Sequence, residues 1–88
     1  MNKNRRKELM EWVKKAEDWA AQGEELKDEL ENICSDEDDY LSNMPENLQS
    51  SQRAMDAEEA IDAMNEAIDS MGNAIESAEE AASCIEDI

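Results

Sequence analysis

The side chains best able to do chemistry in this chain are carboxylates, and one group of them forms an unbroken acidic run. Four acidic residues follow one another between Ser35 and Tyr40. Such a run suggests calcium, but an EF-hand loop needs a glycine at its sixth position and a glutamate at its twelfth. Counted from Asp36, those positions hold Leu41 and Asn47. The run therefore predicts a solvated helix end, and neither a metal site nor a cofactor is expected.

A second group of carboxylates recurs at helical spacing in the C-terminal half. Steps of three and four residues advance about 4.5–6 Å along a helix. Phosphates along one DNA strand repeat on a comparable scale, with one charge per about 3.4 Å of axis. A row of this kind is suited to a phosphate-binding groove, although a merely solubilising surface is the alternative. The predicted partner-binding residues are this row and three residues of the acidic run: Glu59, Asp62, Glu66, Asp69, Glu76, Glu80, Asp36, Asp38 and Asp39.

The remaining reactive side chains are two cysteines, Cys34 and Cys84, in a chain without histidine. A cysteine nucleophile needs a neighbouring base, so catalysis by a Cys–His pair is excluded. The helical register below separates the two residues, whereas a disulfide needs Cα atoms within about 7 Å. Free thiols are predicted, as in a reducing compartment. No enzyme is expected, because two packed helices offer no concave pocket.

The elements that position these side chains are two helices with a seven-residue apolar repeat, which is typical of a coiled-coil seam. From Ala60 to Asp87 the repeat runs through four heptads that each begin with alanine. In the N-terminal half the same repeat predicts two seam columns, and because the second contains both tryptophans, they are expected in the core. An exposed partner-binding hot spot is the alternative for the tryptophans. The columns are Leu9, Ala16, Gly23, Leu30 and Glu37, and Trp12, Trp19, Leu26, Ile33 and Tyr40.

The expected fold is all-α, a single domain over residues 1–88 in which two helices form a long antiparallel hairpin. Asn4 is the expected N-cap of a first helix over about 5–40. Pro45 suits the start of a new helix, which places the turn at about 41–46 and the second helix at about 46–87. Gly23 is expected to stay within the first helix, with a break there as the alternative.

The register of the hairpin is predicted by pairing residues whose numbers sum to 87, such as Gly23 with Met64 and Leu26 with Ile61. This register places the basic cluster Lys3 to Lys15 beside the acidic end of the second helix, and salt bridges between them are expected to select the orientation. Two flanking pairs are predicted in addition, Arg53 with Asp36 and Lys27 with Glu58. A nucleic-acid patch is the alternative for the basic cluster.

A column of alanines widens the apolar stripe of the second helix beyond two columns. It leaves two arrangements open: the alanines lie under the stems of long side chains, or they admit a second hairpin in a homodimeric four-helix bundle. The column is Ala60, Ala67, Ala74 and Ala81.

Composition narrows the class of partner. The net charge is −17, from 25 acidic and 8 basic residues. A chain of this sign repels nucleic acid and anionic membrane, so direct binding to either is not expected and the partner should be basic. The N-terminus lacks the apolar core of a signal peptide, and no apolar run approaches the roughly twenty residues of a membrane span. A cytoplasmic protein is expected.

The segment from Tyr40 to Arg53, YLSNMPENLQSSQR, is followed by acidic A-I-D heptads. Over about residues 30–88 this combination resembles a group of small acidic helical proteins of Gram-positive bacteria and their phages and mobile elements. The resemblance implies a helical hairpin in a bacterial or phage setting, and no catalytic residue. With the acidity, it favours an inhibitor that mimics nucleic acid and blocks a basic nucleic-acid-binding protein, of the anti-restriction or anti-CRISPR type. A structural or adaptor coiled coil without mimicry is the alternative.

Overall fold

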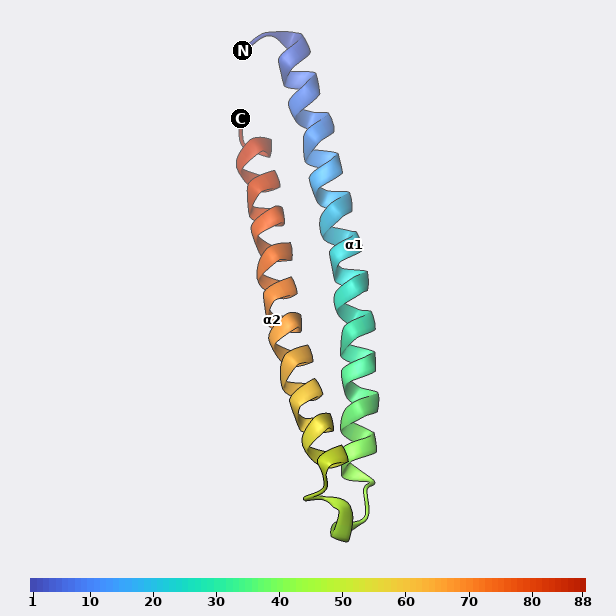
Figure 1. Ribbon diagram of the computed structural model, residues 1–88. Coiled ribbons are helices and arrows are strands. Elements are labelled where there is room, and N and C mark those ends of the chain that lie inside the picture. The colour runs from blue at the N-terminus through green and yellow to red at the C-terminus, as the bar shows by residue number, and fades with distance from the viewer.

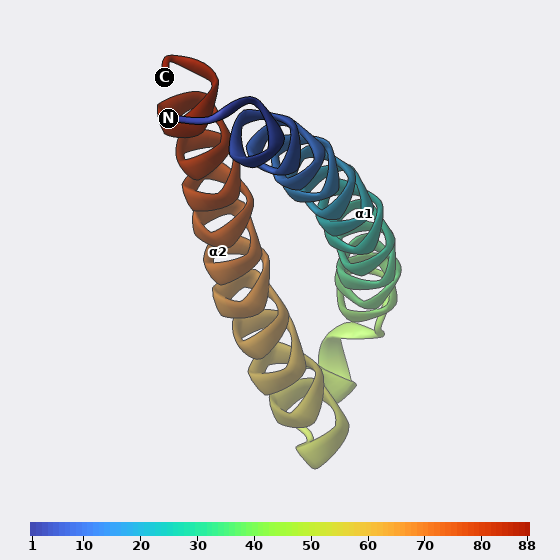
Figure 2. The same ribbon diagram turned by 90° about the horizontal axis from the view of Figure 1, so that it is seen from above.

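The chain forms two long helices that pack antiparallel as an extended hairpin, as the sequence predicts (Figure 1). The computed structural model describes residues 1–88, with α1 over Lys3–Ser42 and α2 over Gln52–Glu86. The Cα atoms extend over 70 × 15 × 14 Å, and both termini lie at the open end. Seen from above, the molecule is one pair of helices, and no third element covers either side of the pair (Figure 2).

The first helix begins and ends slightly outside its predicted bounds. Asn2, not Asn4, is its N-cap, because the Asn2 Oδ1 atom accepts a hydrogen bond of 2.7 Å from the backbone N–H of Arg5. The helix then runs without interruption through Gly23, so the alternative of a break there is wrong. It also includes the acidic run and ends at Ser42.

The turn is longer than predicted, and the second helix begins six residues later. Pro45 opens a short 3-10 turn, η1 (Glu46–Leu48), which is closed by a hydrogen bond of 2.8 Å from the Leu48 N–H to the Pro45 carbonyl. The new α-helix starts only where Ser51 caps it, with its Oγ atom accepting from the Ala54 N–H at 3.3 Å. The sequence analysis placed the start of the second helix at Pro45, whereas the structure places its N-cap at Ser51.

The longer turn changes the register of the hairpin. A Cβ atom built on Gly23 would contact Ile75, and the Cys34 Sγ atom lies 3.7 Å from Asn65 Oδ1. Residue numbers of these facing pairs sum to 98 and 99, so the predicted sum of 87 is wrong. The difference of eleven residues corresponds to a slide of about 16 Å along the helix axis.

The core confirms one predicted seam column of α1 and corrects the other. Leu9, Ala16, Gly23, Leu30 and Glu37 are all buried or half-buried against α2. The second column lies one residue later than predicted and is formed by Val13, Ala20, Lys27, Cys34 and Leu41.

The tryptophans are therefore not in the core. Trp12 is 45% exposed and Trp19 is 51% exposed, so the prediction that they pack in the seam is wrong. The seam is instead filled by small and medium side chains, and no large side chain is fully buried. In α2 the buried residues are Ala54, Ala57, Ile75 and Ala82. The half-buried residues of the same two columns are Ile61, Met64, Ile68, Met71, Ala78 and Ile85.

The two thiols are free: Cys34 is buried in the seam and Cys84 is exposed. Neither helix contains a stretch both long enough and apolar enough to cross a bilayer.

Candidate functional site

One broad side of the hairpin is apolar, because each helix has three apolar columns and the seam covers only two of them. Residues seven apart share one side of a helix, so the uncovered column forms a continuous row. The two rows lie on the same side of the pair: Trp12 and Trp19 line a hollow of about 310 Å³ together with Ala78 and Ala81. This apolar face comprises Trp12, Trp19, Leu26, Ile33 and Tyr40 of α1, and Ala60, Ala67, Ala74 and Ala81 of α2.

The opposite side of the hairpin is acidic. Glu17 of α1 and Glu86 of α2 meet there, and Glu31 and Asp38 lie with Asn65 around a second hollow of about 400 Å³. Rows of carboxylates from both helices thus run beside each other. This acidic face comprises Glu17, Glu24, Glu31 and Asp38 of α1, and Glu58, Asp62, Asp69, Glu76, Glu79 and Glu86 of α2, all of them exposed.

The structure brings together the six carboxylates predicted on the second helix. Asp62, Asp69 and Glu76 form one row of the acidic face, and Glu59, Glu66 and Glu80 form the neighbouring row on the back of α2. All six are exposed and none makes an ion pair.

The three predicted residues of the acidic run are exposed but do not form one surface. Successive residues of a helix point about 100° apart. Only Asp38 therefore joins the acidic face, while Asp39 lies on the back of α1 and Asp36 beside the apolar row.

Sequence reasoning missed the α1 half of the acidic face. The signal was present, because Glu17, Glu24 and Glu31 recur every seven residues. Their row borders the seam column that contains Val13 and Cys34. It was overlooked because the column of Trp12 was assigned to the seam, which turns this row away from α2.

Glu17 and Glu86 approach each other at the open end of the hairpin, and this changes the pKa of Glu86. A hydrogen bond with the Glu17 carboxyl, repulsion from the Glu17 charge, and smaller effects of desolvation and Asp87 raise the pKa of Glu86 above its ordinary value. Proximity of two carboxylates disfavours having both ionised.

The basic residues do not neutralise the acidic rows by the predicted pairs. The one ion pair is within α1, between Lys27 Nζ and Glu31 Oε1 at 3.7 Å, and not between Lys27 and Glu58. The cluster from Lys3 to Lys15 forms no salt bridge with α2, and Arg53 forms none with Asp36. None of these three predicted pairings forms in the register that the structure has.

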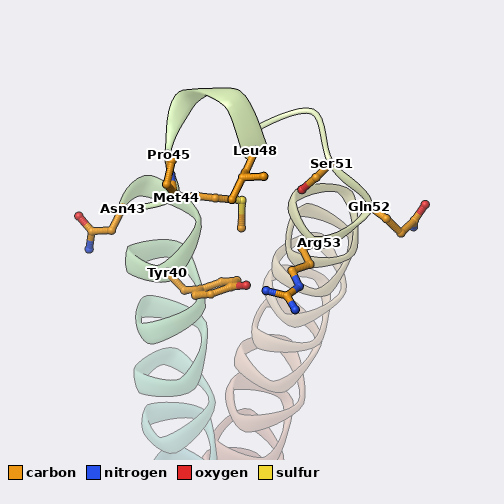
Figure 3. Close-up of a pocket in the computed structure, with 8 residues that line it drawn as sticks. All are labelled: Tyr40, Asn43, Met44, Pro45, Leu48, Ser51, Gln52 and Arg53. Atoms are coloured by element: carbon orange, nitrogen blue, oxygen red, sulfur yellow. The ribbon is translucent and has the colours of Figure 1, made fainter.

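A hollow of about 720 Å³ lies at the tip of the hairpin, so the expectation that two helices offer no concave pocket fails there. Tyr40 and Arg53 reach toward one another from α1 and α2, and Met44 and Leu48 of the turn cover them (Figure 3). Asn43 and Gln52 point away (Figure 3). The lining is mostly apolar with one cation. It suits contact with an apolar group.

The residues described above therefore form two extended faces and a hollow at the tip of the hairpin. They contain neither a nucleophile–base pair nor a cluster that could hold a metal ion. One face offers apolar contact and the other offers negative charge. No protein-family model matches the chain, and no curated protein or solved structure shows a significant match to it.

Proposed function

We propose that this protein is a protein-binding inhibitor whose acidic face occupies the nucleic-acid-binding surface of a basic partner. The observation that supports the proposal is the convergence of carboxylate rows from both helices on one face, where a single lysine, Lys27, forms an ion pair. The resemblance to small acidic proteins of bacterial mobile elements adds the setting: a phage or plasmid product acting on a host nuclease or defence protein.

The rows supply charge at a spacing suited to such a surface. Within one row the carboxylates recur about every 10.5 Å, and neighbouring rows fill the intervals at about 4.5–6 Å. The rod is 70 Å long and its helices are continuous, so a basic groove would meet these charges on a rigid support. A flexible acidic tail would first have to be ordered, at an entropic cost.

Electrostatic complementarity of this kind acts mainly on association. Opposite fields steer the encounter and raise the on-rate, and salt screens them over about 8–10 Å. The net charge of −17 also repels nucleic acid itself, so the protein competes with nucleic acid for the partner without binding to it.

The proposal is tested by removing charge without changing shape. Asp62, Glu66 and Asp69 become Asn, Gln and Asn in one variant. The matched control, E11Q/D18N/E25Q, removes three exposed charges from the back of α1. The immobilised wild-type protein is used to capture proteins from nuclease-treated bacterial lysate, with duplex DNA as competitor. Association of the purified captured partner is then measured over a range of salt concentrations.

The expected result is a DNA-displaceable partner that binds the α2 triple variant with a slower on-rate and a shallower salt dependence than wild type. The control triple should bind nearly as wild type does. A partner that DNA does not displace, or one that binds both triples equally at low salt, would contradict the proposal.

A second candidate function is favoured by the apolar face: a structural or adaptor coiled coil without mimicry. A surface of half-exposed aromatic and aliphatic side chains is typical of a docking surface. In that case both charge triples are neutral, and substitutions of the apolar row abolish function while helicity is retained.

A further inference from the structure

We propose that the apolar face is covered by a second copy of this chain, which gives a four-helix bundle with the acidic faces outward. The proposal is independent of what the acidic face binds. It accounts for an inversion in the monomer, in which both tryptophans and the tyrosine are exposed while the seam is filled by small and medium side chains.

That inversion is clear from the exposed fractions. Trp12, Trp19, Leu26, Ile33 and Tyr40 are 45, 51, 58, 57 and 47% exposed. Of the nine buried residues four are alanines, and the others are Val13, Gly23, Cys34, Met44 and Ile75. Only nine of 88 residues are buried. A core this thin is seldom sufficient in a small scaffold, which usually needs disulfides, a metal or oligomerisation. Both thiols are free, so oligomerisation is the stabilising device that the chain itself offers.

The apolar face is complementary to itself. At each level of the hairpin, a large side chain of α1 stands beside small residues of α2, as Trp19 does beside Ala78 and Ala81. A two-fold axis parallel to the long axis of the hairpin places the large row of each copy on the alanine row of the other. A two-fold axis across the hairpin would stack large on large and small on small. Dense packing requires large against small, so the parallel axis is selected, with both turns at the same end.

The size of the face is sufficient for a dimer. The interval from Trp12 to Tyr40 corresponds to about 42 Å of helix. The Cα width of the hairpin is 15 Å. With side chains included, the face offers on the order of 600–800 Å² per copy, against about 800 Å² per partner in a standard interface. It exceeds the largest apolar patch of most monomers, about 300–600 Å².

The net charge of −17 on each copy opposes association at long range, but the contact itself does not place carboxylates against carboxylates. In the proposed bundle the edge column of α1 in one copy runs along the edge column of α2 in the other. At the register of the hairpin, Glu29 and Asp36 then lie beside Ser70 and Ala63 of the second copy, which are small and neutral. The α2 edge column is Asp56, Ala63, Ser70, Ser77 and Cys84. The two rows of the apolar face contain no charged residue, and the adjoining seam column of α1 contains one from Trp12 to Tyr40, the half-buried Glu37.

Sedimentation analysis and tryptophan fluorescence test the proposal on the full chain. The expected mass at about 100 µM is twice 10.0 kDa, since a micromolar dissociation constant suffices for dimerisation there. Dilution should shift the emission of Trp12 and Trp19 to longer wavelength as water reaches them. A wild-type protein that sediments as a monomer at this concentration would overturn the proposal.

Matched variants identify the surface. A67E/A74E places two carboxylates in the alanine row and should yield a monomer of unchanged helicity, because both positions are exposed in the hairpin. Asn73→Glu adds a charge on the back of α2 and should remain dimeric. A second variant, L26E, tests the other row in the same way. Dimers that survive both A67E/A74E and L26E would show that the copies meet elsewhere, and would overturn the proposal.

Disulfide mapping determines the axis. In a background without Cys34 and Cys84, chains with Leu26→Cys are mixed with chains with Ala74→Cys. The parallel axis brings these two positions together, so a mixed disulfide should form on mild oxidation. The axis across the hairpin instead brings Leu26 near Leu26 of the second copy. Self-linking of L26C in place of the mixed product would contradict the arrangement.

Discussion

A Cβ atom placed on Gly23 would stand 3.0 Å from Cγ1 of Ile75, so α2 inserts an isoleucine where α1 has no side chain. The sequence predicts that Gly23 stays within the first helix and faces a residue of the second, and the structure confirms the uninterrupted helix. The neighbour is Ile75, however, and not the predicted Met64.

The two glycines should respond oppositely to alanine. Gly72→Ala is expected to raise the free energy of unfolding by roughly 0.5–1 kcal/mol, because alanine favours the helix and the nearest obstacle is Lys27 Cε at 3.9 Å. Gly23→Ala gains the same propensity but crowds Ile75, and overpacking costs about 1–3 kcal/mol. Urea unfolding at one fixed protein concentration compares them. Equal stabilisation by both changes would show that Ile75 does not fill the space beside Gly23.

The start of α2 is tested by a pair of adjacent serines. Ser51→Ala removes the side chain that caps the Ala54 N–H and should cost about 0.5–2 kcal/mol. Ser50→Ala lies one residue earlier, is exposed, and should change stability by less than about 0.5 kcal/mol. Thermal unfolding followed by circular dichroism measures both. If the Ser50 variant loses more stability than the Ser51 variant, the cap has been assigned to the wrong residue.

The class of fold could be predicted from the sequence, because a seven-residue repeat interrupted by a single proline is typical of two long helices. One seam column of α1 was predicted correctly through Gly23 and its neighbours. The second column was not, since α1 has apolar residues at three positions of each heptad. Choosing the larger side chains for the seam is reasonable on burial energy, yet the structure buries Val13 and leaves Trp12 outside.

Two separate assignments account for the wrong register and for the missed α1 half of the acidic face. Assigning the helix start to Pro45 instead of Ser51 shortened the turn and moved every facing pair. Assigning Trp12 to the seam rotated α1 and hid the row of Glu17. Each helix has three apolar columns, and the sequence does not show which two of them face the other helix and which one stays uncovered.

The corrected register predicts a disulfide between α1 and α2. Asn65→Cys, introduced with Cys84→Ser, should form a bond with the native Cys34, whose Sγ atom lies 3.7 Å from Asn65 Oδ1. The pair L26C/I61C, in a background without native cysteines, should stay reduced within a chain because the two positions are about 16 Å apart along the axis. Mass spectrometry after mild oxidation distinguishes the two, and a cross-link in the second protein only would restore the register that sums to 87.

The meeting of Glu17 and Glu86 predicts a dependence of stability on pH. The folded pKa of Glu86 is raised, chiefly by Glu17, so the folded state binds its proton more tightly than the unfolded chain does. The free energy of unfolding is therefore greater below the ordinary glutamate pKa and falls as pH rises through the raised pKa. Glu17→Gln should reduce this fall and raise the midpoint of thermal unfolding at pH 7.

The control for this effect is Glu11→Gln, which removes a charge from the back of α1 and should leave the Glu86 contribution in place. Carboxyl NMR provides a direct measurement, in which Glu86 should titrate at higher pH than in the Glu17 variant. Identical titration of Glu86 in both proteins would show that the two carboxyls do not meet in solution.

The nine residues from Asn43 to Ser51 that join the helices also determine the order in which the hairpin assembles. Contacts next to the turn close a short loop, whereas those at the open end join residues almost a whole chain apart, and loop-closure entropy increases with that separation. Contacts between α1 and α2 should therefore form first near Leu41 and Ala54 and then extend toward the termini. Amide hydrogens near the open end, where Glu17 faces Glu86, should exchange with solvent first, and those of the helical residues nearest the turn should exchange last.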